Sequence, residues 1–200
     1  MNEANKQTRN RRAVGYWHFM REFVRNPRQI GAICPSSPFL ARRMASLVPA
    51  GDGVVVELGP GGGAVTAALL SHGVHARDLV LVERSAALSA HLAKRFPGVR
   101  LIQGDAMHLS RFDAVQRQPV RAIVSSLPLR SLPRAVVRQI LEQVALVSGP
   151  GTVFIQFSYA LRGSGQGMAP GFERDQAHLV WRNLPPARIE AFRFRAGSMQ

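Results

Sequence analysis

The chain has 200 residues, 46% of them apolar, and a formal net charge of +14. This length fits one domain with a core of its own, and no window approaches the roughly 18 consecutive apolar residues of a membrane-spanning helix. A lone cysteine, Cys34, excludes an intramolecular disulfide and fits a reducing compartment. The charge is almost all arginine and indicates a polyanionic partner, either nucleic acid or an anionic membrane face, unless it only solvates the surface.

Residues 1–50 are expected to form a basic arm followed by helices packed on the rest of the domain. Residues 1–12 are polar and basic, and no signal peptide is predicted. Between residues 13 and 26, aromatic and apolar side chains recur at helical spacing beside arginines. This pattern predicts either a membrane-surface helix that doubles as a lid or an ordinary packing helix. A further helix is expected from Pro38 to about Val48, with Ser36 or Ser37 as its N-cap.

Residues 51–200 are predicted to form the core domain, because strands and helices alternate regularly. The expected strands are 54–58, 78–83, 99–103, 120–125 and 152–159, and the expected helices are 64–70, 86–95 and 133–147. This alternation predicts an α/β fold with a Rossmann-like, doubly wound parallel sheet. Residues 162–174 are expected to be a glycine-rich loop, and runs 178–184 and 188–195 are expected to form an antiparallel C-terminal hairpin that completes a seven-stranded, mostly parallel sheet.

The stretch from Val54 to Gly63 combines a β-branched strand with a glycine turn and a helix start, which is typical of a small-molecule site. Its Gly59-x-Gly61-x-x-Ala64 pattern also fits a dinucleotide fingerprint. Glu57 decides between the two ligands, because a carboxylate at the strand end suits a cationic group better than a pyrophosphate. S-adenosylmethionine carries both an ammonium and a sulfonium, so the sequence favours it over NAD.

Two further acids follow the next strands of the predicted sheet. The carboxyl ends of parallel strands meet at one edge, where ligands bind. Glu83 is therefore expected to accept hydrogen bonds from ribose hydroxyls. Asp105 is expected either to accept from the adenine amine, with the Ala106 amide donating to the ring, or only to cap a helix.

Residues 57–63, Glu83 and residues 104–106 resemble the cofactor motifs of class I S-adenosylmethionine-dependent methyltransferases. Three further stretches resemble one family within this class, the bacterial phospholipid N-methyltransferases. They are residues 23–33, 35–41 and 125–129. That resemblance implies stepwise N-methylation of phosphatidylethanolamine towards phosphatidylcholine, with S-adenosylhomocysteine as the by-product, by a cytoplasmic enzyme peripheral on the inner face of the cell membrane. One departure is Gly62, where the family's glycine turn often has threonine or serine.

Three other functions stay open. The ribosomal RNA adenine dimethyltransferases have a similar core, but their Asn-Leu-Pro-Tyr motif corresponds here to residues 126–129, which supply no aromatic to stack on a flipped base. No nucleic acid partner is therefore expected. A nicotinamide-dependent oxidoreductase and a non-catalytic membrane-binding module are the remaining alternatives.

The predicted site residues fall into three groups, with no metal ligand among them and a monomer expected. Those predicted to bind the cofactor are Ser36, Ser37, Glu57, Gly59, Gly61, Gly63, Glu83, Arg84, Asp105, Ala106 and Ser126. Those predicted to contact the lipid or the membrane are Trp17, Phe19, Met20, Arg21, Arg25, Leu127 and Arg130. Tyr16, His18 and Tyr159 are candidates for positioning the amine or accepting its proton.

Overall fold

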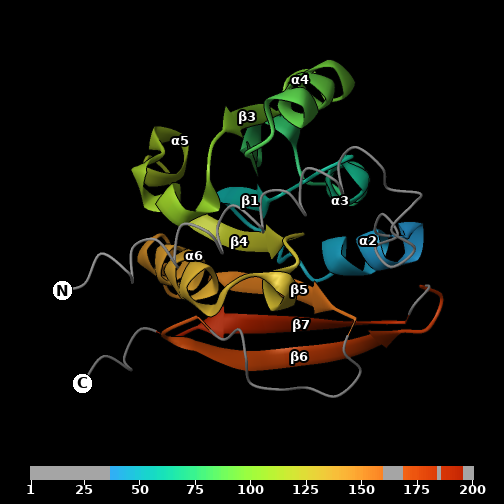
Figure 1. Ribbon diagram of the computed structural model, residues 1–200, viewed down its shortest axis with the longest axis vertical. Coiled ribbons are helices and arrows are strands. Elements are labelled where there is room, and N and C mark those ends of the chain that lie inside the picture. The colour runs from blue at the N-terminus through green and yellow to red at the C-terminus, as the bar shows by residue number, and fades with distance from the viewer. Residues whose placement is uncertain (1–36, 160–168, 184–185, 196–200) are drawn as a thin grey trace, which may run out of the picture.

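The computed structural model describes residues 37–159, 169–183 and 186–195. Within these residues one sheet has the strand order β3-β2-β1-β4-β5-β7-β6 (Figure 1). Its strands are β1 (Val54–Leu58), β2 (Leu79–Glu83), β3 (Arg100–Gln103), β4 (Val120–Ser125), β5 (Val153–Ser158), β6 (Phe172–Val180) and β7 (Ala187–Phe194). Strands β1 to β5 pair in parallel, whereas β7 is antiparallel to both β5 and β6. The carboxyl ends of β1 to β5 therefore lie at the same edge as the end of β6 and the start of β7.

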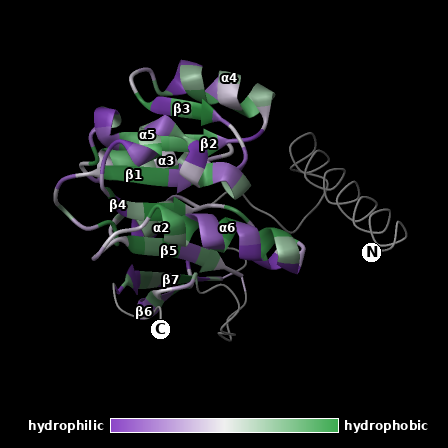
Figure 2. Cartoon of the chain, turned by 90° about the vertical axis from the view of Figure 1, so that its left-hand side faces the viewer, coloured by the Kyte–Doolittle hydropathy of each residue, from purple (hydrophilic) through white to green (hydrophobic). Residues whose placement is uncertain are grey.

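Helices cover both faces of this sheet, and each face has its own apolar core. One face packs on α2 (Pro38–Ala45), α3 (Ala64–Ser71) and α4 (Ala86–Arg95), and its core includes Leu40, Leu69 and Leu92. The other face packs on the 3-10 helix η2 (Ala106–Arg111), α5 (Asp113–Gln116), the 3-10 helix η3 (Leu129–Ser131) and α6 (Arg134–Leu146). A further 3-10 helix, η1 (Ala76–Asp78), precedes β2. Apolar residues run along the central strands (Figure 2) because those strands are buried on both faces.

The predicted architecture is confirmed, but the C-terminal part of the prediction needs two corrections. β6 begins at Phe172, inside the stretch expected to be a loop, and it ends at Val180 rather than at residue 184. As an edge strand it exposes polar side chains, so it lacks the apolar alternation of a buried strand. Asp175 pairs with Arg193 of β7, and Glu173 pairs with Arg195 just after β7.

Helix α2 shows how local sequence places an element at the site. The Ser37 hydroxyl oxygen accepts a hydrogen bond from the Leu40 amide at 3.2 Å, as an N-cap does, and Pro38 occupies the first helical position. The Ser37 amide donates to Asn183 Oδ1 at 3.2 Å, which ties the start of α2 to the turn after β6. None of the described helices is both long and apolar enough to span a bilayer.

Candidate functional site

The turn from β1 to α3 is a glycine cradle that only glycine can form at certain positions. Gly59, Gly61 and Gly63 have φ angles of +67°, +54° and +80°, in the left-handed region. A Cβ atom on Gly59 would lie 2.4 Å from Leu127 Cδ2, and one on Gly63 would lie 2.5 Å from Phe96 Cε2. Gly62 has neither constraint, since nothing lies within 4 Å of its Cβ position. The chain's departure from the family pattern at this position therefore leaves the cradle intact.

Glu57 is fully buried beneath this cradle. One carboxylate oxygen, Oε2, accepts a hydrogen bond from Thr66 Oγ1 at 2.6 Å, and the other, Oε1, has no hydrogen-bond partner among the described residues. Burial is the main cause that raises the pKa of Glu57 from 4.5 to about 8, with the nearby charge of Glu83 adding to it and the Thr66 hydrogen bond opposing it. A buried, half-satisfied acid is costly to the free protein, and a cationic ligand would offset that cost.

Glu83 at the end of β2 holds the glycine cradle in place. Its Oε2 accepts from the Gly61 amide at 3.2 Å, and its Oε1 accepts from the Ser85 amide at 2.8 Å. A carboxylate has about four lone-pair positions, so two remain for further donors such as ribose hydroxyls. The predicted ribose role is thus compatible with the structural one.

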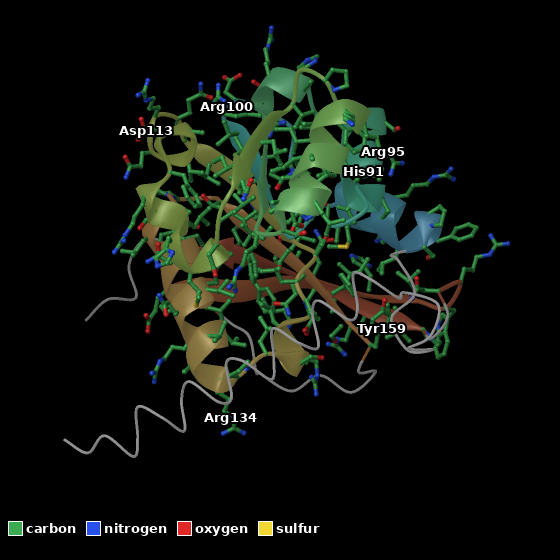
Figure 3. The ribbon with its side chains drawn as sticks, turned by 45° about the horizontal axis from the view of Figure 1, so that its top comes forward. His91, Arg95, Arg100, Asp113, Arg134 and Tyr159 are labelled. Carbon is green, nitrogen blue, oxygen red and sulfur yellow. The ribbon has the colours of Figure 1, made fainter. Side chains whose placement is uncertain are left out.

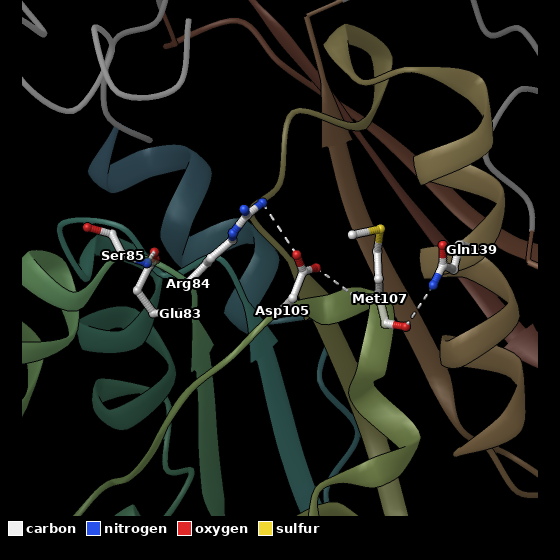
Figure 4. A network of polar contacts seen from close by, with 6 residues as sticks. All are labelled: Glu83, Arg84, Ser85, Asp105, Met107 and Gln139. Atoms are coloured by element: carbon white, nitrogen blue, oxygen red, sulfur yellow. Dashed lines mark hydrogen bonds and ion pairs between the residues drawn. The ribbon is translucent and has the colours of Figure 1, made fainter. Parts of the chain in front are cut away.

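Asp105, after β3, has the capping role that the sequence gave as one of two possibilities, and its adenine-binding role stays a prediction. Its Oδ1 caps η2 by accepting from the Met107 amide at 2.9 Å, and its Oδ2 lies 3.4 Å from Arg84 Nη1, on the segment after β2 (Figure 4). Asp105 therefore caps η2, as one of the two predictions had it. The ion pair links the segments after β2 and β3 at the edge where an adenine is expected. Ala106 follows directly and is buried.

Two serine hydroxyls at the end of β4 extend this group of polar atoms. Ser125 is fully buried, and its Oγ, like that of Ser126, has no hydrogen-bond partner among the described residues. The Ser126 amide donates to the Leu58 carbonyl at 2.9 Å, so these serines lie beside the end of β1. Buried polar atoms without partners are rare in folded proteins and need a specific reason. With Glu57 Oε1, the two serine hydroxyls make three such atoms at the ends of the adjacent strands β1 and β4, which indicates a ligand-binding position.

The remaining predicted residues lie at the same edge or outside the described part. Tyr159 follows the carboxyl end of β5, and its ring packs edge-to-face on Phe157 with 5.5 Å between the ring centres. It lies far from Arg100, which begins β3 at the amino edge of the sheet (Figure 3). Leu127 packs on Gly59, and Arg130 belongs to η3. The residues outside the described ranges are Tyr16, Trp17, His18, Phe19, Met20, Arg21, Arg25 and Ser36, and their predicted roles stay predictions.

Comparisons with known proteins agree with this geometry, although no protein-family model matches the chain. The structure of 1,6-didemethyltoxoflavin-N1-methyltransferase from Burkholderia thailandensis, with bound S-adenosylhomocysteine, superposes with a TM-score of 0.68 at 17% identity and covers 94% of this chain and 90% of that one. The N-methyltransferase NodS from Bradyrhizobium japonicum, also bound to S-adenosylhomocysteine, gives a TM-score of 0.63 at 16% identity over 81% of this chain and 90% of that one. The chain has the class I methyltransferase fold.

Two curated relatives are similar to this methyltransferase-fold chain in sequence. Ornithine lipid N-methyltransferase of Singulisphaera acidiphila is 29% identical over 188 residues, which span 86% of this chain and 92% of that protein. Ribosomal RNA small subunit methyltransferase A of Phenylobacterium zucineum is 36% identical over 90 residues, which span 44% of this chain and 31% of that protein. The predicted fold and the predicted cofactor, S-adenosylmethionine, both agree with these comparisons.

The candidate site also contains residues that sequence reasoning missed. Thr66, in the first turn of α3, holds the carboxyl group of Glu57. A hydroxyl residue at a core-facing position of an otherwise apolar helix was the available signal. Leu127 was predicted to contact the lipid, yet its side chain also packs against Gly59, so it helps shape the cofactor cradle.

Proposed function

We propose that the protein transfers methyl groups from S-adenosylmethionine to the primary amine of a membrane lipid, with phosphatidylethanolamine methylated stepwise towards phosphatidylcholine. The observation that supports this proposal most is an exposed aromatic and basic surface at the same sheet edge as the glycine cradle and the acids around it. The similarity to an ornithine lipid N-methyltransferase supports the lipid class and makes ornithine lipid the second substrate to test.

The described residues fit the cofactor group by group. The buried Glu57 would accept a hydrogen bond from the cationic methionine part of the cofactor or neutralise its charge. Glu83 would bind the ribose, and the Asp105–Ala106 segment would bind the adenine. Glycine keeps the cradle compact, because a Cβ at Gly59 or Gly63 would collide with the side chain of Leu127 or Phe96. Bound S-adenosylmethionine supplies an electrophilic methyl group, and the chain's residues fix where the amine meets it.

The surface that supports a membrane substrate consists of Phe39, Trp181 and Arg182, and we call it the aromatic patch. Phe39 and Trp181 are 45% and 68% exposed, and they are two of the four large apolar side chains exposed in the described part of the chain. The Arg182 guanidinium lies 4.9 Å from the centre of the Phe39 ring, which brings α2 and the turn after β6 together. Exposed aromatics beside arginines suit the interface of an anionic bilayer.

The amine must lose a proton before it can attack the methyl group. A primary ammonium with a pKa near 10 is neutral at pH 7 at a cost of about 4 kcal/mol. Desolvation beside a sulfonium lowers that cost, and a proton acceptor removes the rest. Tyr159 is the proposed acceptor among the described residues, with Tyr16 and His18 proposed outside them.

An RNA substrate is the second candidate, favoured by the partial match to a ribosomal RNA methyltransferase. That match covers only 31% of the relative, and the residue after Pro128, where the RNA enzymes carry an aromatic, is Leu129. Leu129 is buried in the apolar core rather than presented to a base. These observations favour the lipid.

Methyl transfer to each candidate substrate tests the proposal directly. The protein is incubated with labelled S-adenosylmethionine and vesicles that contain phosphatidylethanolamine, ornithine lipid or neither, and in a parallel arm with ribosomal RNA. Label is expected in the extracted amine lipids and absent from the RNA. Label in RNA alone would establish the rival function, and a protein that binds the vesicles without labelling anything would be a non-catalytic module.

Vesicle binding is expected to depend on the aromatic patch. Trp181→Ala should weaken binding to anionic vesicles by about tenfold or more, because a buried indole contributes about 2–3 kcal/mol. The matched control is Leu146→Ala, since Leu146 is 69% exposed but ends α6 at the opposite edge of the sheet. Co-sedimentation with vesicles measures both, and equal binding by the two variants would remove the patch from the proposal.

A further inference from the structure

A row of polar side chains crosses three strands beside the cofactor cradle. The strand registers place Ser125 opposite Gln156, and Gln156 opposite Glu190, so all three lie on the sheet face that packs on α6. This face is otherwise lined by apolar residues such as Ile123, Phe154 and Phe192. Ser125, Gln156 and Glu190 lie towards the carboxyl edge of this face, where the cofactor site lies.

Two arginines share the one carboxylate at the end of this row. Arg174 Nη2 and Arg188 Nε each lie 3.3 Å from Glu190 Oε1, so the group carries a net positive charge. The side chains of Arg188 and Glu190 are only 20% and 16% exposed. Arg188 Nε is buried and makes no hydrogen bond of good geometry to a described residue. A largely buried guanidinium with one shared counter-charge retains most of its donors for another anion.

The other ion pairs between β6 and β7 show that this arrangement is not simply how the two strands pair. Arg193 with Asp175 and Arg195 with Glu173 are one-to-one pairs towards the opposite edge, and their arginines are 39% and 63% exposed. Excess positive charge and deeper burial coincide at Glu190, at the edge that faces the site.

We propose that Arg188, supported by Arg174 and oriented by Glu190, binds the anionic group of the substrate while its amine reaches the methyl donor. This inference rests on the proposed function and names its anion subsite. Strand β7 lies one strand spacing, about 5 Å, from β5 and two spacings, about 10 Å, from β4. An anion on the arginines and an amine above the end of β5 are thus separated by about the length of a short headgroup. Phosphatidylethanolamine carries its phosphodiester one ethylene link from its amine, and an ornithine headgroup carries a carboxylate on a somewhat longer chain.

Substitution of Arg188 tests this subsite, with Arg193→Gln as the matched control. Arg188→Gln is expected to raise the KM for amine lipids about 10- to 100-fold, because one charge-assisted contact is lost, while calorimetric affinity for S-adenosylmethionine stays unchanged. Arg188→Lys, which keeps the charge, is expected to recover part of the loss, and Arg193→Gln should behave as the wild type. Separate vesicles with phosphatidylethanolamine and with ornithine lipid show whether the anion is a phosphodiester or a carboxylate.

A second measurement separates this inference from the proposed function. Glycerophosphoethanolamine and an N-acyl ornithine are titrated calorimetrically into the cofactor-loaded wild type and Arg188→Gln. Binding of either compound that is lost in the variant supports the subsite even if no lipid is methylated. A wild-type KM and wild-type binding in a folded Arg188→Gln variant would overturn it, as would binding of neither compound by the wild type.

Discussion

Glu57→Gln is expected to weaken S-adenosylmethionine binding by about 100-fold or more at pH 8. Removing one partner of a buried charge pair costs about 3–5 kcal/mol, because the remaining charge loses its compensation. Glu57 is fully buried, and its Oε1 has no partner among the described residues, so this oxygen is the one proposed to face the cation. Isothermal titration calorimetry measures the loss, and circular dichroism of the variant shows that the fold persists.

The same residue makes cofactor binding depend on pH, and the sign follows from its raised pKa. In the free protein the pKa of Glu57 is about 8, so its carboxyl group is mostly protonated at pH 7. A bound cation lowers this pKa, so binding releases a proton, and affinity should rise by up to about tenfold per pH unit before levelling above pH 8. Calorimetric titrations in buffers of different ionisation enthalpy measure the number of protons released when the cofactor binds. Equal affinity at pH 6 and pH 8.5 would contradict this account.

Two variants sharpen this test. Glu57→Gln should bind weakly with no slope between pH 6 and pH 8. Thr66→Val removes the hydrogen bond that lowers the pKa of Glu57, so the rise in affinity should shift to higher pH. In the free protein, the stability that protonated Glu57 contributes is fully present below pH 4.5 and is lost as the pH rises through about 8. Thermal unfolding at pH 9 should therefore find Glu57→Gln more stable than the wild type.

Alanine substitutions along the glycine cradle are expected to give graded losses, with Gly59→Ala the most severe. This substitution combines left-handed strain of about 1–2 kcal/mol with a Cβ 2.4 Å from Leu127 Cδ2, and it should abolish measurable cofactor binding. Gly61→Ala meets nothing closer than 4.0 Å, so only the strain applies. Gly62→Ala has neither cost and should bind the cofactor as the wild type does.

Leu127 offers a way to separate the two costs at Gly59. Adding Leu127→Ala to Gly59→Ala removes the colliding methyl group, so part of the stability should return while the backbone strain remains. Chemical denaturation and calorimetric titration of the series measure both effects. Equal losses in the Gly59→Ala and Gly62→Ala variants would show that the cradle's backbone geometry does not matter for the ligand.

Local patterns in the sequence were enough to predict most of the sheet and the cofactor edge. The informative patterns are local in the sequence. They are the run Val54–Leu58, the glycines after it and the acids Glu57, Glu83 and Asp105. Parallel strands bring their carboxyl ends to one edge whatever the exact register, so these residues were expected together before any contact was known. The start of β6 was missed because an edge strand tolerates polar residues that read as a loop.

Only the tertiary structure decided how the acids are paired and what lies beyond them. The hydrogen bond from Thr66, the full burial of Glu57 and its raised pKa depend on how α3 packs on β1. The meeting of Arg174, Arg188 and Glu190 depends on a long-range antiparallel register, in which a shift by one residue would move each side chain to the other face. Charge and residue type are properties of the chain, but desolvation and cross-strand proximity arise only when distant segments pack. That packing buries a carboxylate oxygen without a described partner and brings two arginines to one carboxylate, which are the observations behind the proposed cation and anion sites.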